Sequence, residues 1–167
     1  MSTQESIITL KPVFHLSFDL EEIQPVASRA AGDDVVVNIT GGFTKSYDEK
    51  YPFNSTILHG RDDILVNPTH NSLDCRVYGK TEDGAGFTIR YGGIVQASAP
   101  VGAVCSGQSN GHTYEESYVT NNMTVFIDKD APKKYDWIKF HNLVGRGRFF
   151  RDDKGFHIEY IMHAIVQ

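Results

Sequence analysis

The chain has 167 residues, of which 40% are hydrophobic and 22% are charged, and its formal net charge is −5. This length suits one domain with a sizeable core, so we expect a single β-barrel domain over residues 1–167 with its core at about residues 8–166. The basic residues are few and scattered. That distribution argues against nucleic acid as a partner, because binding phosphates requires clustered Lys and Arg side chains.

No segment predicts a membrane span or a secretory signal. A span needs about 20 consecutive apolar residues, and residues 1–14 lack a basic stretch followed by an apolar one. We therefore expect a cytoplasmic protein in which Cys75 and Cys105 are reduced small side chains rather than a disulfide. The sequence leaves homodimerisation open.

The first part of the chain predicts one clear strand followed by a connection. In residues 13–20 the even-numbered side chains are apolar, so we expect them to be buried, with Val13 out of phase. Residues 21–34 contain Pro and Gly and are typical of a connection, with a helical turn at residues 28–31.

The next part predicts short strands interrupted by polar segments. Residues 35–40 are β-branched apart from Asn38, so we expect a strand there. It runs into the glycine pair at 41–42, which indicates a bulge or a close backbone approach. Residues 44–54 are expected to form a loop, and residues 55–58 a short strand that ends in the polar segment 59–63.

A hairpin is the strongest local signal in the chain. Two runs of β-forming residues, 73–78 and 87–91, flank an Asp-Gly turn at 83–84. Alternation gives the hairpin one apolar face and one polar face, and the polar face lies either in water or in a cavity. Charged side chains are mostly exposed, so the hairpin alone favours a polar face that lies in water.

The C-terminal part again predicts paired strands. Residues 97–116 are rich in Gly, Ser and Ala and are expected to form a long surface loop, and two strands follow within 117–127. A short helical turn is expected at 135–140. Residues 143–151 should pair with a long strand at 156–166. Consecutive antiparallel strands without a long helix predict an all-β barrel or sandwich of about 8–10 strands, and a closed barrel can hold one small ligand.

The familiar motifs of metal, phosphate and nucleophile sites are missing from the sequence. The seven histidines include no pair at HxH or HxxxH spacing. No GxSxG elbow stands between a predicted strand and a predicted helix, and no glycine-rich phosphate loop precedes a helix. We therefore expect no metal site and no cofactor.

Strand phase could instead gather polar side chains into one cavity. An interior arginine needs a partner, which Asp74 or Glu159 could supply, and its forked donors suit a ligand with acidic or carbonyl oxygens. The polar candidates are Asp74, Arg76, Tyr78, Arg90, His157, Glu159 and His163, with His59 and Asp62 from a strand end. The candidates for the apolar wall are Phe43, Tyr91, Tyr118 and Trp137.

Several motifs in matching order resemble a known family. They are GGF at 41–43, HGRDD at 59–63, LDCRVYGKTEDGAGFTI at 73–89, YVT at 118–120, and YDWI and LVGRGRF within 135–149. Over residues 8–166 the chain resembles the domain of unknown function 3237 family of small lipocalin-like β-barrels with a central cavity. It departs from the family pattern at Gly60-Arg61, Thr120 and Lys139, and in a longer segment at 98–116.

The resemblance implies a function, because some fungal members of the family are hetero-Diels–Alderases of tropolone sesquiterpenoid biosynthesis. Such a pericyclase would dehydrate a hydroxylated tropolone to an o-quinone methide and guide its cycloaddition with a humulene-type alkene, in an apolar polyketide- or terpenoid-binding cavity. Arg76, Arg90 or Tyr78 would donate to the tropolone oxygen, and His59 or Glu159 would act as the acid for water loss.

Two other classes of function stay open at this stage. A non-catalytic barrel that binds or carries a small molecule would need the same cavity, and product formation would distinguish it from an enzyme. A structural or interaction domain would have no cavity.

Overall fold

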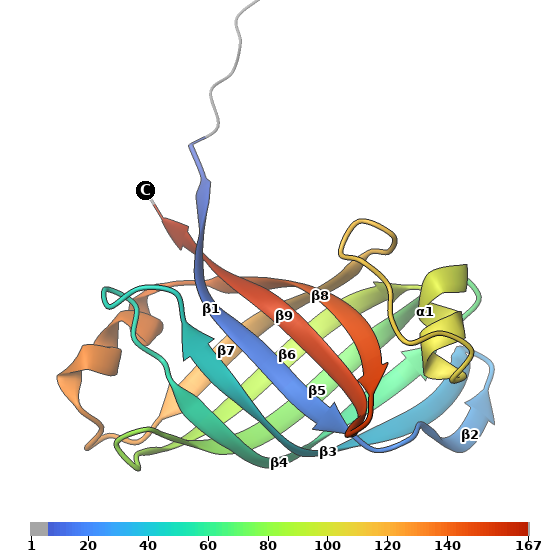
Figure 1. Ribbon diagram of the computed structural model, residues 1–167, viewed down its shortest axis with the longest axis horizontal. Helices are drawn as coiled ribbons and strands as arrows, with labels where there is room; N and C mark the ends of the chain where they lie inside the picture. Colours follow the sequence, from blue (N-terminus) through green and yellow to red (C-terminus); the bar gives the residue numbers. More distant parts are fainter. Residues whose placement is uncertain (1–6, 167) are drawn as a thin grey trace, which may run out of the picture.

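The computed structural model describes residues 7–166. Residues 1–6 and 167 lie outside the described residues, and so does part of the prediction that residues 1–14 carry no secretory signal. Most of the described chain forms one curved antiparallel sheet (Figure 1). Its elements are β1 (Thr9–Leu20), β2 (Gln24–Arg29), β3 (Gly32–Ser46), β4 (Ser55–Val66), β5 (His70–Thr81), β6 (Gly86–Gln96), α1 (Ala99–Cys105), β7 (Val119–Ile127), the 3₁₀ helix η1 (Lys133–Phe140), β8 (Leu143–Asp152) and β9 (Gly155–Val166).

The sheet closes into a barrel because β1 pairs along both of its edges. The strand order is β1-β9-β8-β7-β6-β5-β4-β3-β2, and β1 also pairs with β3. Eight strands therefore form the closed wall, while β2 extends beyond it as a partner of β3 alone. Closure confirms the barrel and excludes the sandwich, and the nine strands among residues 7–166 fall within the expected range.

Alternation along β1 fills the barrel as the sequence predicts, with one exception. Phe14, Leu16 and Phe18 are completely buried. Val13 is buried as well, although it was expected to be out of phase. The register between β1 and β9 shifts between Pro12 and Phe14, so Val13 occupies a bulge that turns its side chain away from solvent.

The expected connection at residues 21–34 is wrong, and so is the helical turn at 28–31. These residues form the hairpin of β2 and β3, with Arg29 paired to Gly32. Gly32 has a φ of 139°, and a Cβ there would overlap the Val66 carbonyl oxygen. Glycine therefore allows β3 to start close against β4. β3 continues to Ser46, so the loop expected at residues 44–54 is found at residues 47–54 only.

The polar segment 59–63 does not end a strand. It lies in the middle of β4, which contains a bulge, because Ile57 pairs with Gly79 while His59 pairs with Tyr78. One extra residue reverses the inward phase of a strand. As a result Asp62 points into the barrel, whereas uninterrupted alternation from Ile57 would turn it outward.

Two short helical segments close opposite ends of the barrel (Figure 1). α1 lies within the segment that was expected to be a loop throughout, and it buries Val101 and Val104. η1 confirms the helical turn expected at 135–140, and it buries Tyr135 and Ile138. No helix among residues 7–166 is both long and apolar enough to cross a membrane.

The glycine pair of β3 lies where the barrel closes, which confirms the expected close backbone approach. Gly42 pairs with Phe18 of β1, and its φ is 134°. A Cβ at Gly42 would overlap the carbonyl oxygen of Ser17. The space between β1 and β3 therefore requires glycine at this position.

We expect Gly42→Ala to lower the free energy of unfolding by about 3 kcal/mol or more, because it adds both backbone strain and a steric clash. Urea denaturation at neutral pH measures this change. Gly86→Ala is the matched control, because a Cβ at Gly86 meets nothing within 4 Å. Equal denaturation midpoints for the two variants would show that the closure tolerates a side chain.

Candidate functional site

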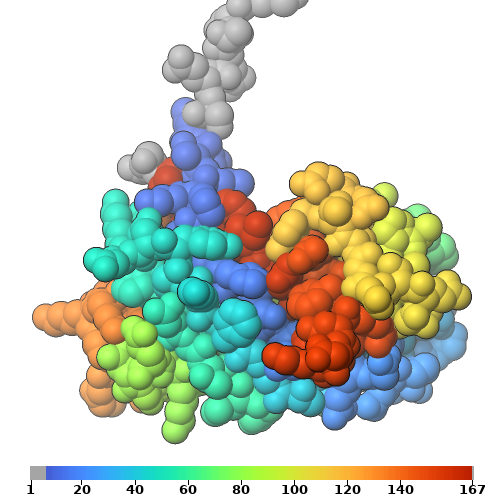
Figure 2. All heavy atoms as spheres, in the orientation of Figure 1, coloured from blue at the N-terminus to red at the C-terminus, as the bar shows by residue number. Residues whose placement is uncertain are grey.

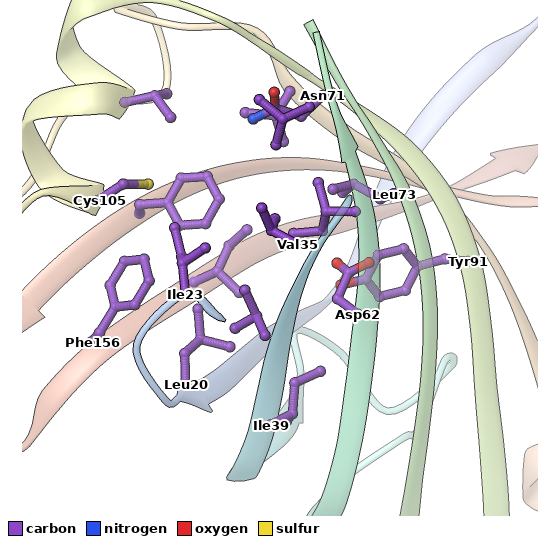
Figure 3. Close-up of a pocket in the computed structure, with 17 residues that line it drawn as sticks. Leu20, Ile23, Val35, Ile39, Asp62, Asn71, Leu73, Tyr91, Cys105 and Phe156 are labelled. Atoms are coloured by element: carbon purple, nitrogen blue, oxygen red, sulfur yellow. The ribbon is translucent and has the colours of Figure 1, made fainter. Parts of the chain in front are cut away.

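A cavity of about 100 Å³ lies inside the barrel at the end that α1 covers (Figure 3). Ile39 and Ile158 lie at its buried end, while the partly exposed Leu20, Ile23 and Cys105 surround its outer end. Thirteen of its 17 lining residues are apolar, and the other four are Asp62, Asn71, Tyr91 and Cys105. The lining suits a small, mostly apolar molecule, and the existence of a cavity argues against a purely structural domain.

Asp62 is the one acidic side chain of this lining. It is only 7% exposed, and no ion pair reaches it among residues 7–166. Burial raises its pKa to about 7, and the carboxylates of Asp63 and Asp74 add to the rise. The Asp74 backbone N–H donates to Asp62 Oδ1 at 3.2 Å and partly offsets these effects on the pKa.

Tyr91 lies beside this carboxyl, and the two side chains point toward one another (Figure 3). Its ring is stacked with Phe18 at 6.3 Å and packs against Tyr160 at 6.1 Å. Burial raises the pKa values of Tyr91 and Tyr160 well above the usual range, so both stay neutral. The Tyr160 hydroxyl and both amide atoms of Asn121 are buried without a hydrogen-bond partner among residues 7–166.

The polar face of the β5–β6 hairpin points away from this cavity. Asp74, Arg76 and Arg90 are exposed on the outside of the barrel, and Tyr78 is 37% exposed. The interpretation that strand phase brings them into the barrel is wrong, because the apolar face of the same hairpin fills the interior. His59 lies outside as well, with its ring 5.2 Å from that of Tyr78.

Glu159 also lies on the outer face, where three side chains surround it. His15 Nε2 lies 3.0 Å from Oε2, the Tyr114 hydroxyl donates to Oε1 at 3.1 Å, and Arg148 Nε donates to the same oxygen. Bonding to His15, followed by bonding to Arg148 and its positive charge, lowers the Glu159 pKa to about 2. Glu159 is therefore ionised at neutral pH and cannot donate the proton expected of it.

Tyr114 ties the segment between α1 and β7 to this face. Figure 2 shows that segment in yellow beside the red surface of the last strands. Arg146 also holds this segment, because its guanidinium donates hydrogen bonds to the carbonyl oxygens of Tyr114 and Ser117. The loop is therefore held against the barrel wall by hydrogen bonds to charged groups.

The two remaining histidine candidates are also outside the barrel. His157 is buried against Phe150, and its ring nitrogens contact Asp19 at 2.9 Å and Asp152 at 3.0 Å. His163 lies in a surface hollow and contacts a backbone carbonyl oxygen of its own strand. Both positions correct the prediction that these residues line the cavity.

Of the four aromatic candidates, Tyr91 alone lines the cavity. Phe43 is 44% exposed and Tyr118 is 50% exposed, both on the outer face. Trp137 belongs to η1 at the opposite end, where its Nε1 donates to the Pro52 carbonyl oxygen at 3.0 Å. A role for the outward-facing candidates stays a prediction, but it concerns the outer surface and not the cavity.

The sequence predicts Asp62 at a strand end and gives no prediction for Asn71, Asn121 or Tyr160. A usable signal existed for Asn121, which is in phase with the apolar residues of β7. Asn71 is likewise in phase with Leu73 and Cys75. A polar side chain in an apolar phase indicates a polar position in a barrel interior.

Neither a metal site nor a disulfide is present in the described part of the chain. No three His, Cys, Asp or Glu side chains among residues 7–166 are grouped so that they could hold a metal ion. Cys75 and Cys105 are free, and burial raises the pKa of both thiols. Neither thiol is activated as a nucleophile.

Comparisons with known proteins agree with the barrel. A family model described as "Protein of unknown function (DUF3237)" matches residues 8–165. A Rhodopseudomonas palustris protein of unknown function has a similar structure, with a TM-score of 0.80, 16% identity, and coverage of 97% of this chain and 100% of that one. A beta-barrel like protein from Acinetobacter baumannii has a TM-score of 0.72 at 21% identity, covering 99% of this chain and 100% of that one.

A solved enzyme from Penicillium herquei is also similar, with a TM-score of 0.58, 16% identity, and coverage of 99% of this chain and 100% of that one. At these levels of identity the solved structures establish the fold alone. No curated protein matches the chain in sequence.

The raised pKa of Asp62 predicts a dependence of stability on pH. The folded pKa of about 7 lies above the ordinary value of 3.8, so the folded state holds the proton more tightly than the unfolded state. The stabilisation is complete below about pH 4 and is lost as pH rises through about 7. Between these pH values we expect the free energy of unfolding of the wild type to fall by about 4 kcal/mol relative to that of Asp62→Asn. Urea denaturation measures this change. Parallel pH profiles would contradict a raised pKa.

The lowered pKa of Glu159 predicts that stability depends on pH in the opposite direction. Its folded pKa of about 2 lies below the ordinary value of 4.5, so its stabilisation is present above about pH 4.5 and is lost as pH falls toward 2. We expect Glu159→Gln to cost about 2 kcal/mol at pH 7 and to flatten this acid limb in thermal denaturation. Glu49→Gln, at an exposed carboxylate, is the control. If Glu159→Gln kept the steep loss of stability at acid pH, that loss would arise from other groups.

Proposed function

The chain belongs to the DUF3237 family, and from that premise we propose that it is a cofactor-independent enzyme that binds a small apolar molecule inside the barrel and exchanges protons with it through Asp62. One observation carries the proposal. A single carboxyl group, with a pKa of about 7, lies within an otherwise almost entirely apolar cavity. Perturbed carboxyl groups in cavities are typical of acid–base sites.

The environment of Asp62 suits proton transfer in both directions. With a pKa of about 7, the acid and the carboxylate are both populated near neutral pH, which is the condition that favours general acid–base catalysis. Tyr91 faces the carboxyl and stays neutral, so its hydroxyl can orient Asp62 or the bound molecule. The apolar walls exclude water and strengthen each hydrogen bond made there.

In its finer form the proposal is the reaction that the family resemblance implies. The Asp62 carboxyl gives its proton to the departing hydroxyl of a hydroxylated tropolone, the C–O bond breaks, and water leaves. The tropolone O–H then returns a proton to the Asp62 carboxylate, which yields a neutral o-quinone methide and restores the acid. Asp62 thus takes the role of acid that was expected of His59 or Glu159.

Cycloaddition of the o-quinone methide with a humulene-type alkene would follow. Orientation alone can lower the barrier of such a step by several kcal/mol. The cavity of about 100 Å³ lies below the roughly 300 Å³ usual for larger ligands. The alkene would therefore meet the diene at the outer end, next to Ile23 and Cys105.

The second candidate function is a barrel that binds or carries a small molecule without changing it. The apolar lining favours it equally, because binding requires shape and burial and not an acid. The two functions differ in whether Asp62 matters for turnover or only for affinity.

The proposal is tested by incubating the protein with a quinone-methide precursor and a humulene-type polyene and measuring dehydration and adduct stereochemistry. We expect Asp62→Asn to reduce turnover at least about 100-fold while binding persists. In the wild type kcat/KM should fall as pH rises above about 7, because the ionised carboxylate cannot donate.

Asp130→Asn is the matched control, because the same chemical change is made at an exposed aspartate that pairs with Lys129 and does not contribute to the Asp62 pKa. Its turnover should stay near that of the wild type. Saturable binding with no product above background in the wild type would exclude the enzyme and support the carrier function. Equal losses in the two variants would exclude a specific role for Asp62.

A further inference from the structure

The cavity has a second polar position at the end opposite Asp62. Asn71 is the second residue of β5 and lines the cavity beside the β4–β5 turn (Figure 3). Its Oδ1 atom is buried and has no hydrogen-bond partner among residues 7–166. Buried polar atoms in proteins are nearly always bonded, so an exception indicates a missing partner such as a ligand or a water molecule.

Local structure does not explain an asparagine at this position. Its cross-strand neighbours are the apolar Val66 and Val95, and asparagine is unfavourable in strands. The adjacent turn is held by Asn67, whose Oδ1 accepts from the backbone N–H groups of Thr69 and His70. Asn71 is therefore not needed to form the turn.

The two polar positions are separated by the length of the cavity. Asn71 and Cys75 point inward on β5, and Cys75 is the cross-strand partner of Asp62. Four residues of extended strand span about 13 Å. The side chain between them on the same face is Leu73, so the space that joins the two ends is apolar.

We propose that the cavity selects an elongated apolar molecule that carries a hydroxyl at the end remote from Asp62, and that Asn71 binds this hydroxyl and so determines specificity. The inference rests on the proposed function, because it places the reacting end of the molecule at Asp62. A hydroxyl both donates and accepts, so it can bond to either atom of the Asn71 amide. An apolar end group would leave the buried Oδ1 unpaired.

A matched pair of probes tests the role of Asn71. 1-Hexanol and 1,6-hexanediol share one chain and differ in the second hydroxyl. Each is titrated into the intact protein and followed by the backbone amide signals of Leu73 and Val95 in NMR spectra. In the wild type we expect the ratio of the hexanol Kd to the hexanediol Kd to be about tenfold higher than in Asn71→Leu, where the second hydroxyl has no partner.

Asn122→Leu is the control, because it makes the same change on the exposed outer face of β7. It should keep the wild-type ratio. An unchanged ratio in Asn71→Leu, with both probes still bound, would overturn the role of Asn71 and mean that water occupies its buried atom, while the proposed function would stand. Failure of both probes to shift Leu73 and Val95 in the wild type would overturn the cavity as a binding site, and with it both proposals.

Discussion

Strand β1 forms backbone pairs along both edges, with β9 on one side and with β3 on the other, and the barrel interior depends on this double pairing. An open sheet of the same strands would expose two edges and one broad apolar face to water. The pairing with β3 brings two backbones close together, and glycine at position 42 removes the side chain that would keep them apart. The absence of a side chain at position 42 thus allows the barrel to close around a cavity.

The inner and outer faces of the barrel wall favour different protonation states of their acidic side chains. Inside, aromatic and branched side chains pack to one end and leave space at the other, where burial favours the neutral form of Asp62. Outside, carboxylates with lowered pKa values are held by cations, as Glu159 is by Arg148. The chain therefore carries two buried or half-buried acids with opposite protonation preferences, and only the inward one can serve as an acid near neutral pH.

The position of Asp62 depends on one irregularity. The bulge after Ile57 reverses the phase of β4, so a carboxyl that regular alternation would expose is turned into the barrel. Bulges often lie next to functional sites because they redirect a side chain without disturbing the rest of the sheet. Asn71 on the neighbouring strand follows regular alternation, and together the two residues place polar atoms at the two ends of an apolar space.

The sequence predicts the all-β class, the hairpin of β5 and β6, the long last strand, and a bulge or close approach at the glycine pair, because period-two alternation and turn residues are local properties. It also determined that the polar face of the hairpin carries Arg76 and Tyr78, but not which side of the wall that face occupies. The tertiary fold sets that side, since closure buries the apolar face and leaves the charged one in water. It also decided that Asp62 and Tyr91 meet, because a bulge and the pairing of distant strands depend on backbone geometry that no local pattern encodes.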